Sequence, residues 1–551
     1  MKSMVRWYDP PALAYTASRV IISNIFGEFA DPRQAQAASR PFDPDEFDPI
    51  YRYAADGDFW FDFVADLGDG WNSTAAIAHA LGQDRIEIGG EAYPRGRFLI
   101  MGGDQVYPQA SRDEYRARLI APYECALPEG SVDPEPHLYA IPGNHDWYDG
   151  LNAFLGLFCS RRTASSGTIE PGRLIGAWRT QQTRSYFALQ LPAGWWVWGV
   201  DTQLNGYIDR AQLDYFGCVA EKFMDPSQRV ILVGPESNWL EVATKGPKVW
   251  RNLVFMKKFI EGRGHSLRLV MAGNLHHFTC YQGDGVIWVG SGGGGAFCDA
   301  THKYGETLTV SAPAAMDQRD IELVRLAEAF PNPQASFNAS LRALLFPVFN
   351  PVMTACLAAI WIAFAWALDV AARTGGGRLA GGLSMPLFDL YRSPLAVFMI
   401  VLAFAGTVGF ADGLGARRWL LGLGHGLAQV MLMLAVPAIA AAYVDSTILL
   451  FLVVGVAGGV ASAFVFGAYL WLALTAMGLH NSHTFSSFRL QDFKHFVRAR
   501  IGPDGKLWLY PIGLTHVPRR WRFEQTGSGA WRAQPEPPLA PQLLSPIGPI
   551  E

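Results

Sequence analysis

The stretch AIPGNHDWYD (residues 140–149) decides how this 551-residue chain is interpreted. The apolar residues 138–141 predict a buried strand, which the following Pro-Gly pair ends. Asn144, His145 and Asp146 then occupy a tight loop directly after that strand. Loops held by rigid strands are common positions for catalytic groups. The stretch therefore predicts a strand that delivers an amide, an imidazole and a carboxylate to one point.

Other apolar stretches are followed by polar side chains in the same way. Residues 61–65 lead to Asp66 and Asp69, residues 97–101 to Asp104, and residues 267–271 to Asn274, His276 and His277. A further predicted strand, residues 229–233, ends near Glu236, for which a solvated turn is an equally good interpretation. In open α/β sheets, ligands bind beyond the carboxyl ends of the strands. The sequence therefore predicts one site assembled from several strand ends.

The motifs GGDQVY (residues 102–107), GNHD (143–146) and GNLHH (273–277) together resemble the calcineurin-like metallophosphoesterases. Their order and spacing match that family over roughly residues 55–300. The resemblance implies an α/β fold of four layers, with two mixed β-sheets flanked by helices and a dinuclear metal site at one edge. It also implies hydrolysis of a phosphomonoester or phosphodiester by a metal-activated water.

The resemblance assigns roles to residues at matching positions. It implies that Asp66, Asp104, Asn144 and His276 bind metal, with Asp104 shared between two ions. It implies that His145 contacts the scissile phosphate and protonates the leaving oxygen, a role that suits a group with a pKa near neutrality. Further candidates are Asp146 as a second catalytic group and Asn72, Tyr107 and His277 on the substrate side, with a structural role also open for His277.

The chain departs from the family pattern in one direction. Metal-binding histidines are absent at Gly68, at the 234–236 loop and at Asn274, and Tyr107 stands where an aspartate is common. Oxygen donors stand nearby instead, namely Asp69, Glu236 and Asn274. Because oxygen-rich sites favour harder cations, we expect two divalent metal ions, with Mn²⁺ first and Mg²⁺, iron and Zn²⁺ as alternatives. The opposing interpretation is a site that holds one metal or none.

Composition separates two parts of the chain. A net charge of -4 offers no global basic field, so we expect no nucleic-acid partner. Charged residues are almost absent from 341–478. We therefore expect an N-terminal helix and loop (1–50), a metallophosphoesterase-like domain (51–330), a transmembrane helical domain (341–478) and a basic cytoplasmic tail (479–551). Residues 11–28 have helical spacing that fits either a membrane surface or a protein core.

The apolar domain contains four predicted spans, 346–370, 395–411, 423–443 and 447–477. A break in the last span at 455–459 would give five. The basic tail favours four, because four spans keep it in the cytoplasm with the N-terminus, which lacks a secretory signal. The spans carry almost no charged side chains, which favours anchoring over transport. Residues 506–514 predict a strand that returns to the cytoplasmic domain, and the Pro-rich end after about residue 532 predicts disorder.

These expectations combine into an integral protein of the cytoplasmic (inner) membrane with its catalytic domain and tail in the cytoplasm. The implied function is metal-dependent hydrolysis of a phosphorylated substrate at that membrane face. The anchor suggests a lipid-linked phosphate and contact with membrane lipid, while nucleotides, phosphoproteins and small phosphoesters stay open, as does the oligomeric state. The alternatives are a catalytically degenerate binding or regulatory module, and a transporter or channel with a cytosolic regulatory domain.

Overall fold

The computed structural model describes residues 1–18, 33, 49–160, 162–163, 169–202, 206–313, 319–380, 390, 392–527 and 529–551. The chain forms two compact units. An α/β unit contains residues 1–5, 15–333 and 489–551, and a helical unit contains residues 6–14 and 334–488. The α/β unit is therefore built from segments on both sides of the helical unit in the sequence.

One nine-stranded sheet of the α/β unit contains the strands that precede three of the motifs. Its order is β23-β20-β19-β2-β5-β6-β10-β9, with β24 paired to β20. The central strands β2, β5, β6 and β10 run parallel. Their bounds are β2 Phe59–Val64, β5 Phe98–Met101, β6 His137–Ala140, β9 Leu174–Ile175, β10 Trp178–Thr180, β19 Lys494–Ile501, β20 Leu507–Leu514, β23 Gln542–Leu543 and β24 Ile547–Ile550.

The second nine-stranded sheet has the order β1-β11-β12-β13-β14-β16-β15-β18-β17. Strands β12, β13, β14 and β16 run parallel, and the strands at either side mix both directions. The bounds are β1 Ile50–Arg52, β11 Phe187–Gln190, β12 Trp195–Gly199, β13 Arg229–Gly234, β14 Ser266–Ala272, β15 Phe278–Gly283, β16 Val286–Ser291, β17 Thr307–Ser311 and β18 Asp320–Phe330.

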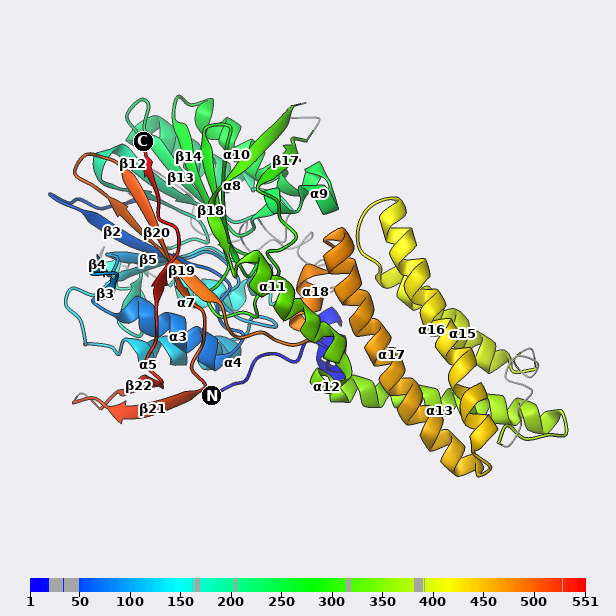
Figure 1. Ribbon diagram of the computed structural model, residues 1–551. Helices are drawn as coiled ribbons and strands as arrows, with labels where there is room; N and C mark the ends of the chain where they lie inside the picture. The colour runs from blue at the N-terminus through cyan, green and yellow to red at the C-terminus, as the bar shows by residue number, and fades with distance from the viewer. Residues whose placement is uncertain are drawn as a thin grey trace. The chain divides into compact units, whose positions relative to one another are not determined.

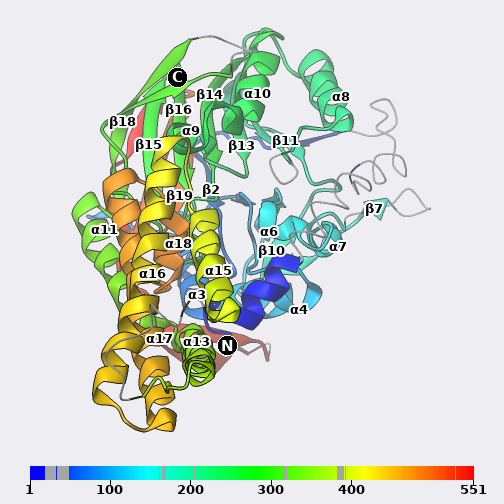
Figure 2. The same cartoon turned by 90° about the vertical axis from the view of Figure 1, so that its right-hand side faces the viewer.

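Three apolar cores hold the α/β unit in four layers. The central core joins the two sheets, with Phe61 and Phe63 of β2 packed in one cluster with Val197 and Ile231 of the second sheet. A second core packs helices α3 (Trp71–Gly82), α5 (Ala121–Ala126) and α7 (Asn152–Phe158) on the first sheet. A third packs α8 (Arg210–Cys218) and α10 (Arg251–Glu261) on the second sheet. Figure 1 shows the strands between α8 and α10 on one side and α3, α5 and α7 on the other, and Figure 2 shows α10 and α3 on opposite sides of β2.

The C-terminal tail completes the first sheet. Strand β19 pairs antiparallel with β2 and with β20, as the orange strands beside blue β2 show in Figure 1. Arg498 of β19 is fully buried and donates to both carboxylate oxygens of Asp62 on β2, at 2.7 and 3.1 Å. The expected disorder after residue 532 is wrong, because β22 (Trp531–Glu536), β23 and β24 lie there. Proline is tolerated on sheet edges, where no ladder donor is needed.

The helical unit contains the apolar helices. By length and composition, three described helices are able to cross a membrane: α13 (Pro351–Thr374), α16 (Ala416–Tyr443) and α17 (Thr447–Met477). The predicted second span corresponds to α15 (Pro394–Phe410), whose 17 residues are shorter. Because α17 is one uninterrupted helix of 31 residues, the break required for five spans is not seen. The four-span count stays a prediction.

Polar side chains join the helices of this unit. Trp361 of α13 donates to the Ser462 hydroxyl of α17 at 3.0 Å, and Gln429 of α16 donates to the Ser462 carbonyl oxygen of α17 at 3.2 Å. Interhelical hydrogen bonds of this kind hold bundles together where lipid offers no hydrophobic driving force. At the N-terminus, residues 10–18 are helical, while most of the predicted helix 11–28 and of the loop 31–50 lies outside the described residues.

Candidate functional site

The predicted strand ends meet at one edge of the two sheets. Asp66 follows β2 and Asp104 follows β5, and their loops are joined by hydrogen bonds from Asp66 N to Gly103 O (3.0 Å) and from Leu67 N to Asp104 O (2.9 Å). His276 follows β14 in the second sheet and reaches the same point. The site is therefore assembled from segments that are up to about 210 residues apart in the sequence.

The backbone at these positions is strained. Asp66, Asp104 and Asn274 have φ angles of 60°, 50° and 72°, in the left-handed region that L-residues rarely adopt. Each such residue costs on the order of 1–3 kcal/mol, and residues of this kind cluster at functional sites. The motif glycine Gly143 is required here, because a Cβ on it would clash with the carboxylate of Asp104. The loops are thus shaped to bring the two carboxylates together.

The Tyr107 hydroxyl lies at the centre of what we name the Tyr107 cluster: Asp66, Asp104, Tyr107 and His276. It donates to Asp66 Oδ1 at 2.8 Å, and lies 3.3 Å from Asp104 Oδ2 and 3.1 Å from His276 Nε2. His276 Nε2 is 3.5 Å from Asp66 Oδ1. All four residues are at most 5% exposed. The sequence predicted Tyr107 as a substrate-side residue in the position of an aspartate and did not indicate this convergence.

The Tyr107 cluster has the donor spacing of a cation site. Ligands about 2.1 Å from a divalent cation lie about 3.0–3.4 Å from each other in octahedral or tetrahedral geometry. Of the four separations given above, 3.1 and 3.3 Å lie within that range, and 2.8 and 3.5 Å lie just outside it. Within the described part of the chain, no three His, Cys, Asp or Glu side chains meet metal-site geometry by themselves. The cluster therefore fits a cation only if the Tyr107 oxygen is counted as a ligand.

The charges of the cluster also favour a cation. Burial raises the pKa of Asp104 well above its ordinary value, and the negative charges of Asp66, Asp146 and Glu236 raise it further. Burial lowers the pKa of His276, but its hydrogen bond to Asp66 and the charges of Asp299 and Asp66 outweigh that effect, and the net direction is upward. In the absence of a metal ion, protons bound to Asp104 and His276 reduce the electrostatic repulsion among the buried carboxylates.

The second predicted metal position is less complete. Asn144 Nδ2 donates to the Tyr148 hydroxyl at 2.8 Å, and its Oδ1 is buried without a hydrogen-bond partner among the described residues. Glu236 is 7% exposed and near enough to raise the pKa of Asp104. Asn274 is held by its backbone N–H, which donates to Asp66 Oδ2 at 2.8 Å. These oxygens are compatible with a second cation that shares Asp104, without histidine ligands.

His145 is oriented by backbone contacts. Its amide donates to Asp104 Oδ1 at 2.8 Å, and its Nδ1 lies 2.7 Å from the Pro108 carbonyl oxygen. Because a carbonyl only accepts, Nδ1 carries the ring proton and Nε2 is the basic atom. Burial lowers the pKa of His145 to about 4. An anionic group beside the ring would raise that pKa and favour a proton on Nε2.

Asp146 holds the loop that presents Asn144 and His145. It accepts hydrogen bonds from Gly143 N at 2.9 Å and Gln105 N at 3.3 Å, and from the Tyr115 hydroxyl. Burial raises its pKa to about 7, against the effect of these donors. Its contacts are those of a positioning residue, whereas the sequence suggested a second catalytic group.

Three other predicted residues make their described contacts with groups other than the Tyr107 hydroxyl. Asp69 Oδ1 accepts from Val5 N at 2.8 Å, which ties the N-terminus to the loop. The Asn72 Oδ1 atom accepts from Trp521 Nε1 at 3.1 Å, so this side chain contacts the tail. His277 is fully buried with its ring 5.2 Å from that of Tyr304. Metal-ligand and substrate roles for these residues stay predictions.

Comparisons with known proteins give distant similarity only. No protein-family profile and no curated protein matches the chain. Among solved structures, one match is described as "GAP50 the anchor in the inner membrane complex of Plasmodium", with a TM-score of 0.31 and 11% identity over 44% of this chain and 73% of that one. Another is described as "Structure of PhoD", with a TM-score of 0.25 and 10% identity over 45% and 59%. These similarities are too distant to assign a function to the chain.

Proposed function

We propose that the chain is a membrane-anchored, metal-dependent phosphoesterase that uses the Tyr107 cluster and His145. The observation that supports it most is the convergence of four donor atoms, from the ends of strands in both sheets, at separations of 2.8–3.5 Å. Asp66, Asp104, Tyr107 and His276 would hold one cation, and Asp104, Asn144 and Glu236 a second.

Each group has a definite part in hydrolysis of a phosphoester. Bound divalent cations would supply Lewis acidity, which lowers the pKa of a water molecule and offsets charge on phosphoryl oxygens. His145, with Nδ1 held by the Pro108 carbonyl, presents Nε2 as the atom that carries a proton to the leaving oxygen. Asp146 and the Asp104–His145 backbone contact keep that ring in place. The substrate would be a phosphomonoester or phosphodiester at the cytoplasmic membrane face, with a lipid-linked phosphate as one class.

Metal content tests this proposal first. The full-length protein is loaded with Mn²⁺, dialysed and analysed for bound metal, beside Asp104→Ala and Asp214→Asn, an exposed carboxylate that pairs with Arg210. We expect metal in the native protein and in Asp214→Asn, and none in Asp104→Ala. Turnover of p-nitrophenyl phosphate or its bis ester should fall by at least about 10³-fold in Asp104→Ala, and by about 10²–10⁴-fold in His145→Ala with metal retained.

A metal-free binding module is the second candidate. It is favoured by the Tyr107 hydroxyl, which satisfies Asp66 by a direct hydrogen bond without any cation. In that case the native protein would retain neither Mn²⁺ nor Mg²⁺ nor Zn²⁺ after loading, and would hydrolyse neither ester. That pair of results would replace the first proposal with the second.

A further inference from the structure

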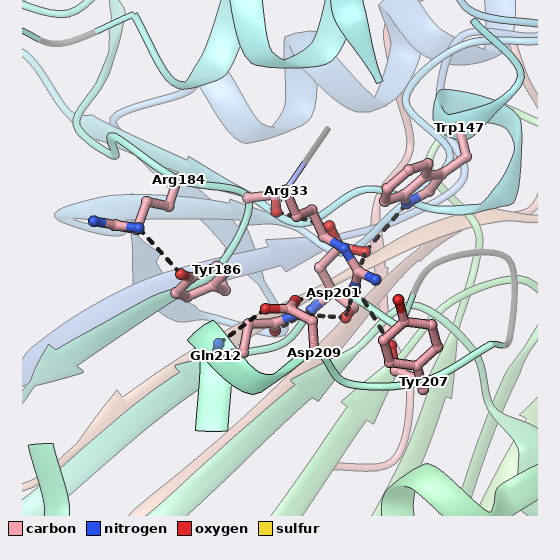
Figure 3. A network of polar contacts seen from close by, with 9 residues as sticks. Arg33, Trp147, Arg184, Tyr186, Asp201, Tyr207, Asp209 and Gln212 are labelled. Carbon is pink, nitrogen blue, oxygen red and sulfur yellow. Dashed lines mark hydrogen bonds and ion pairs between the residues drawn. The ribbon is translucent and has the colours of Figure 1, made fainter. Parts of the chain in front are cut away.

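Arg33 lies in a closely fitted set of acidic and aromatic groups on the far side of the loop that carries His145. Its guanidinium is 3.6 Å from Asp201 Oδ1 and 3.4 Å from Asp209 Oδ2, and its side chain is 1% exposed. It also donates to the carbonyl oxygens of Asp201 at 3.0 Å and Tyr207 at 3.4 Å. Figure 3 shows this guanidinium between the two carboxylates, with the rings of Trp147 and Tyr207 beside it.

The surroundings match a guanidinium better than an ammonium ion. The Arg33 Cζ atom stands 5.2 Å from the centroid of Trp147 and 5.4 Å from that of Tyr207, within the range of cation–π attraction. The two carbonyl oxygens accept from Nη1 of Arg33, and the two carboxylates lie within ion-pair distance of the same nitrogen. The preference for a guanidinium therefore rests on the two rings, because an ammonium ion stacks less well on aromatic rings.

The acidic side of this set is itself fixed by other residues. Asp201 accepts from the Ser185 hydroxyl at 2.7 Å and from Trp147 Nε1 at 3.1 Å. Gln212 donates to the carboxylate of Asp209 at 2.7 Å and to the Asp201 carbonyl at 2.9 Å. Because these acceptors are held independently of Arg33, the set is a preformed site rather than a pair of mobile side chains.

The same set touches the catalytic loop. Trp147 is the last residue of α6 (Asn144–Trp147), the single helical turn that contains Asn144 and His145. Residues two positions apart face opposite sides of a helix. Trp147 accordingly contacts Asp201 and Arg33, while the ring of His145 contacts the Pro108 carbonyl oxygen. A short helix has little stability of its own. Its orientation therefore depends on contacts such as Trp147 with Asp201 and Arg33.

We propose that Asp201, Asp209, Trp147 and Tyr207 form a guanidinium-binding cage, that Arg33 is its resident ligand, and that the occupied cage positions α6 for the reaction. The last part rests on the proposed function, and Arg33 is there a positioning residue. Removal of the Arg33 side chain would leave two buried carboxylates without their cation and a vacant space shaped for a small guanidinium ion.

Chemical rescue of full-length Arg33→Ala tests the cage. The midpoint of thermal unfolding and the turnover are measured with increasing methylguanidinium chloride, and with methylammonium chloride and NaCl at equal ionic strength. We expect Arg33→Ala to have a lower midpoint and lower turnover than the native protein, and methylguanidinium alone to raise both saturably. Arg184→Ala, which removes an arginine that contacts the Tyr186 hydroxyl at 3.3 Å at the edge of this network, is the matched control and should not respond.

The thermal and catalytic readouts separate the two proposals. If the three salts act alike on the midpoint of Arg33→Ala, the cage is refuted, whatever the turnover. If methylguanidinium raises the midpoint but the metal-loaded native protein hydrolyses no phosphoester, the proposed function fails and the cage stands. A rescue of the midpoint without rescue of turnover in a protein whose native form is active would refute the positioning role.

Arg33→Lys covers the case in which Arg33→Ala does not fold, because it keeps the charge and loses only the planar fork. We expect its kcat to fall more for an alkyl phosphate than for p-nitrophenyl phosphate, with KM little changed. A poor leaving group needs the proton from His145, and a good one does not. Equal losses for both substrates, or no loss for either, would contradict a role in positioning α6.

Discussion

Two pairs of buried carboxylates in the α/β unit differ in what lies between them. Asp201 and Asp209 surround the Arg33 guanidinium, which carries a permanent charge. Asp66 and Asp104 surround the Tyr107 hydroxyl, which is neutral, because burial and the two carboxylates raise its pKa well above the ordinary value. Among the described residues, the ion-pair partner of Asp66 is His276, and no Lys or Arg pairs with either Asp66 or Asp104.

The difference separates a filled site from one that still requires a ligand. A buried carboxylate with a permanent partner is stable as folded, whereas one without a partner shifts its pKa or binds a cation. The Arg33 cage has its cation built into the chain. Among the described residues, no Lys or Arg forms an ion pair with the Tyr107 cluster: protons and the His276 imidazole offset its charge, and the buried Lys494 acts on His276 without an ion pair to the cluster. An external cation is therefore expected at the Tyr107 cluster and not at the cage.

The largest expected effect is an opposite response of the two pairs to the same substitution. Asp201→Asn leaves Arg33 buried without one of its counter-ions, and breaking a buried ion pair from one side costs about 3–5 kcal/mol. Asp104→Asn in metal-free protein removes a carboxyl whose ionisation is already opposed by burial and by the neighbouring acids, so the stability should change little or rise. Denaturant unfolding of both variants without metal measures the difference. Equal losses of unfolding free energy in the two variants would contradict the proposed difference between the two pairs of carboxylates.

A divalent cation should stabilise the Tyr107 cluster as the Arg33 guanidinium stabilises the cage. At a concentration 100 times its dissociation constant, a ligand of the folded state adds about 2.7 kcal/mol to the stability. We expect Mn²⁺ to raise the thermal midpoint of the native protein and of Asp201→Asn, and to leave Asp104→Asn unchanged, because that variant lacks the shared ligand. Equal Mn²⁺ shifts in native protein and Asp104→Asn would place the cation elsewhere.

Tyr107→Phe tests whether the phenolic oxygen at the centre of the Tyr107 cluster takes part in metal binding. The substitution keeps the ring, which packs 4.4 Å from that of His145 between centroids, and removes only the hydroxyl. If the hydroxyl is a ligand or orients the ligands, metal affinity should fall by about 10–100-fold. Competition with a metal-sensitive dye gives the affinity directly. Tyr93→Phe, which loses a hydroxyl contact with Glu91 outside the Tyr107 cluster, is the control, and an unchanged affinity in Tyr107→Phe would exclude the phenolic oxygen from the site.

The sequence predicted the strands of the site well because each is an apolar run that ends at a polar loop. Residues 61–65, 97–101 and 138–141 correspond to β2, β5 and β6 within a few positions. It missed the role of Tyr107, because a hydroxyl contact with Asp66 and His276 joins segments far apart in the chain. Asp201 had a readable signal, since it follows the apolar run WWVWGV in the manner of Asp66 and Asp104. Nothing in the residues near Arg33 indicated that it lies beside Trp147.

The smallest expected effect is a slope of stability with pH that only the Tyr107 cluster produces. The folded-state pKa of His276 is raised above its ordinary 6.5, so its contribution to stability is present below pH 6.5 and is lost as the pH rises through the raised value. The raised pKa of Asp104 acts in the same direction, because ionisation of a buried acid is costly. Arg33 keeps its charge throughout this range, so the cage adds no slope.

Metal-free native protein should therefore lose stability relative to Asp104→Asn as the pH rises, by at most about 1.4 kcal/mol per pH unit, because the variant lacks the titrating carboxyl of Asp104 and keeps His276. Saturating Mn²⁺ should abolish that difference in slope, because the cation takes the place of the protons and binds more tightly at higher pH. Thermal unfolding across pH 6–8, with and without metal, measures both slopes. If stability changes with pH equally in native protein and Asp104→Asn without metal, Asp104 does not release a proton in this range. The Tyr107 cluster would then need no external cation, like the Arg33 cage.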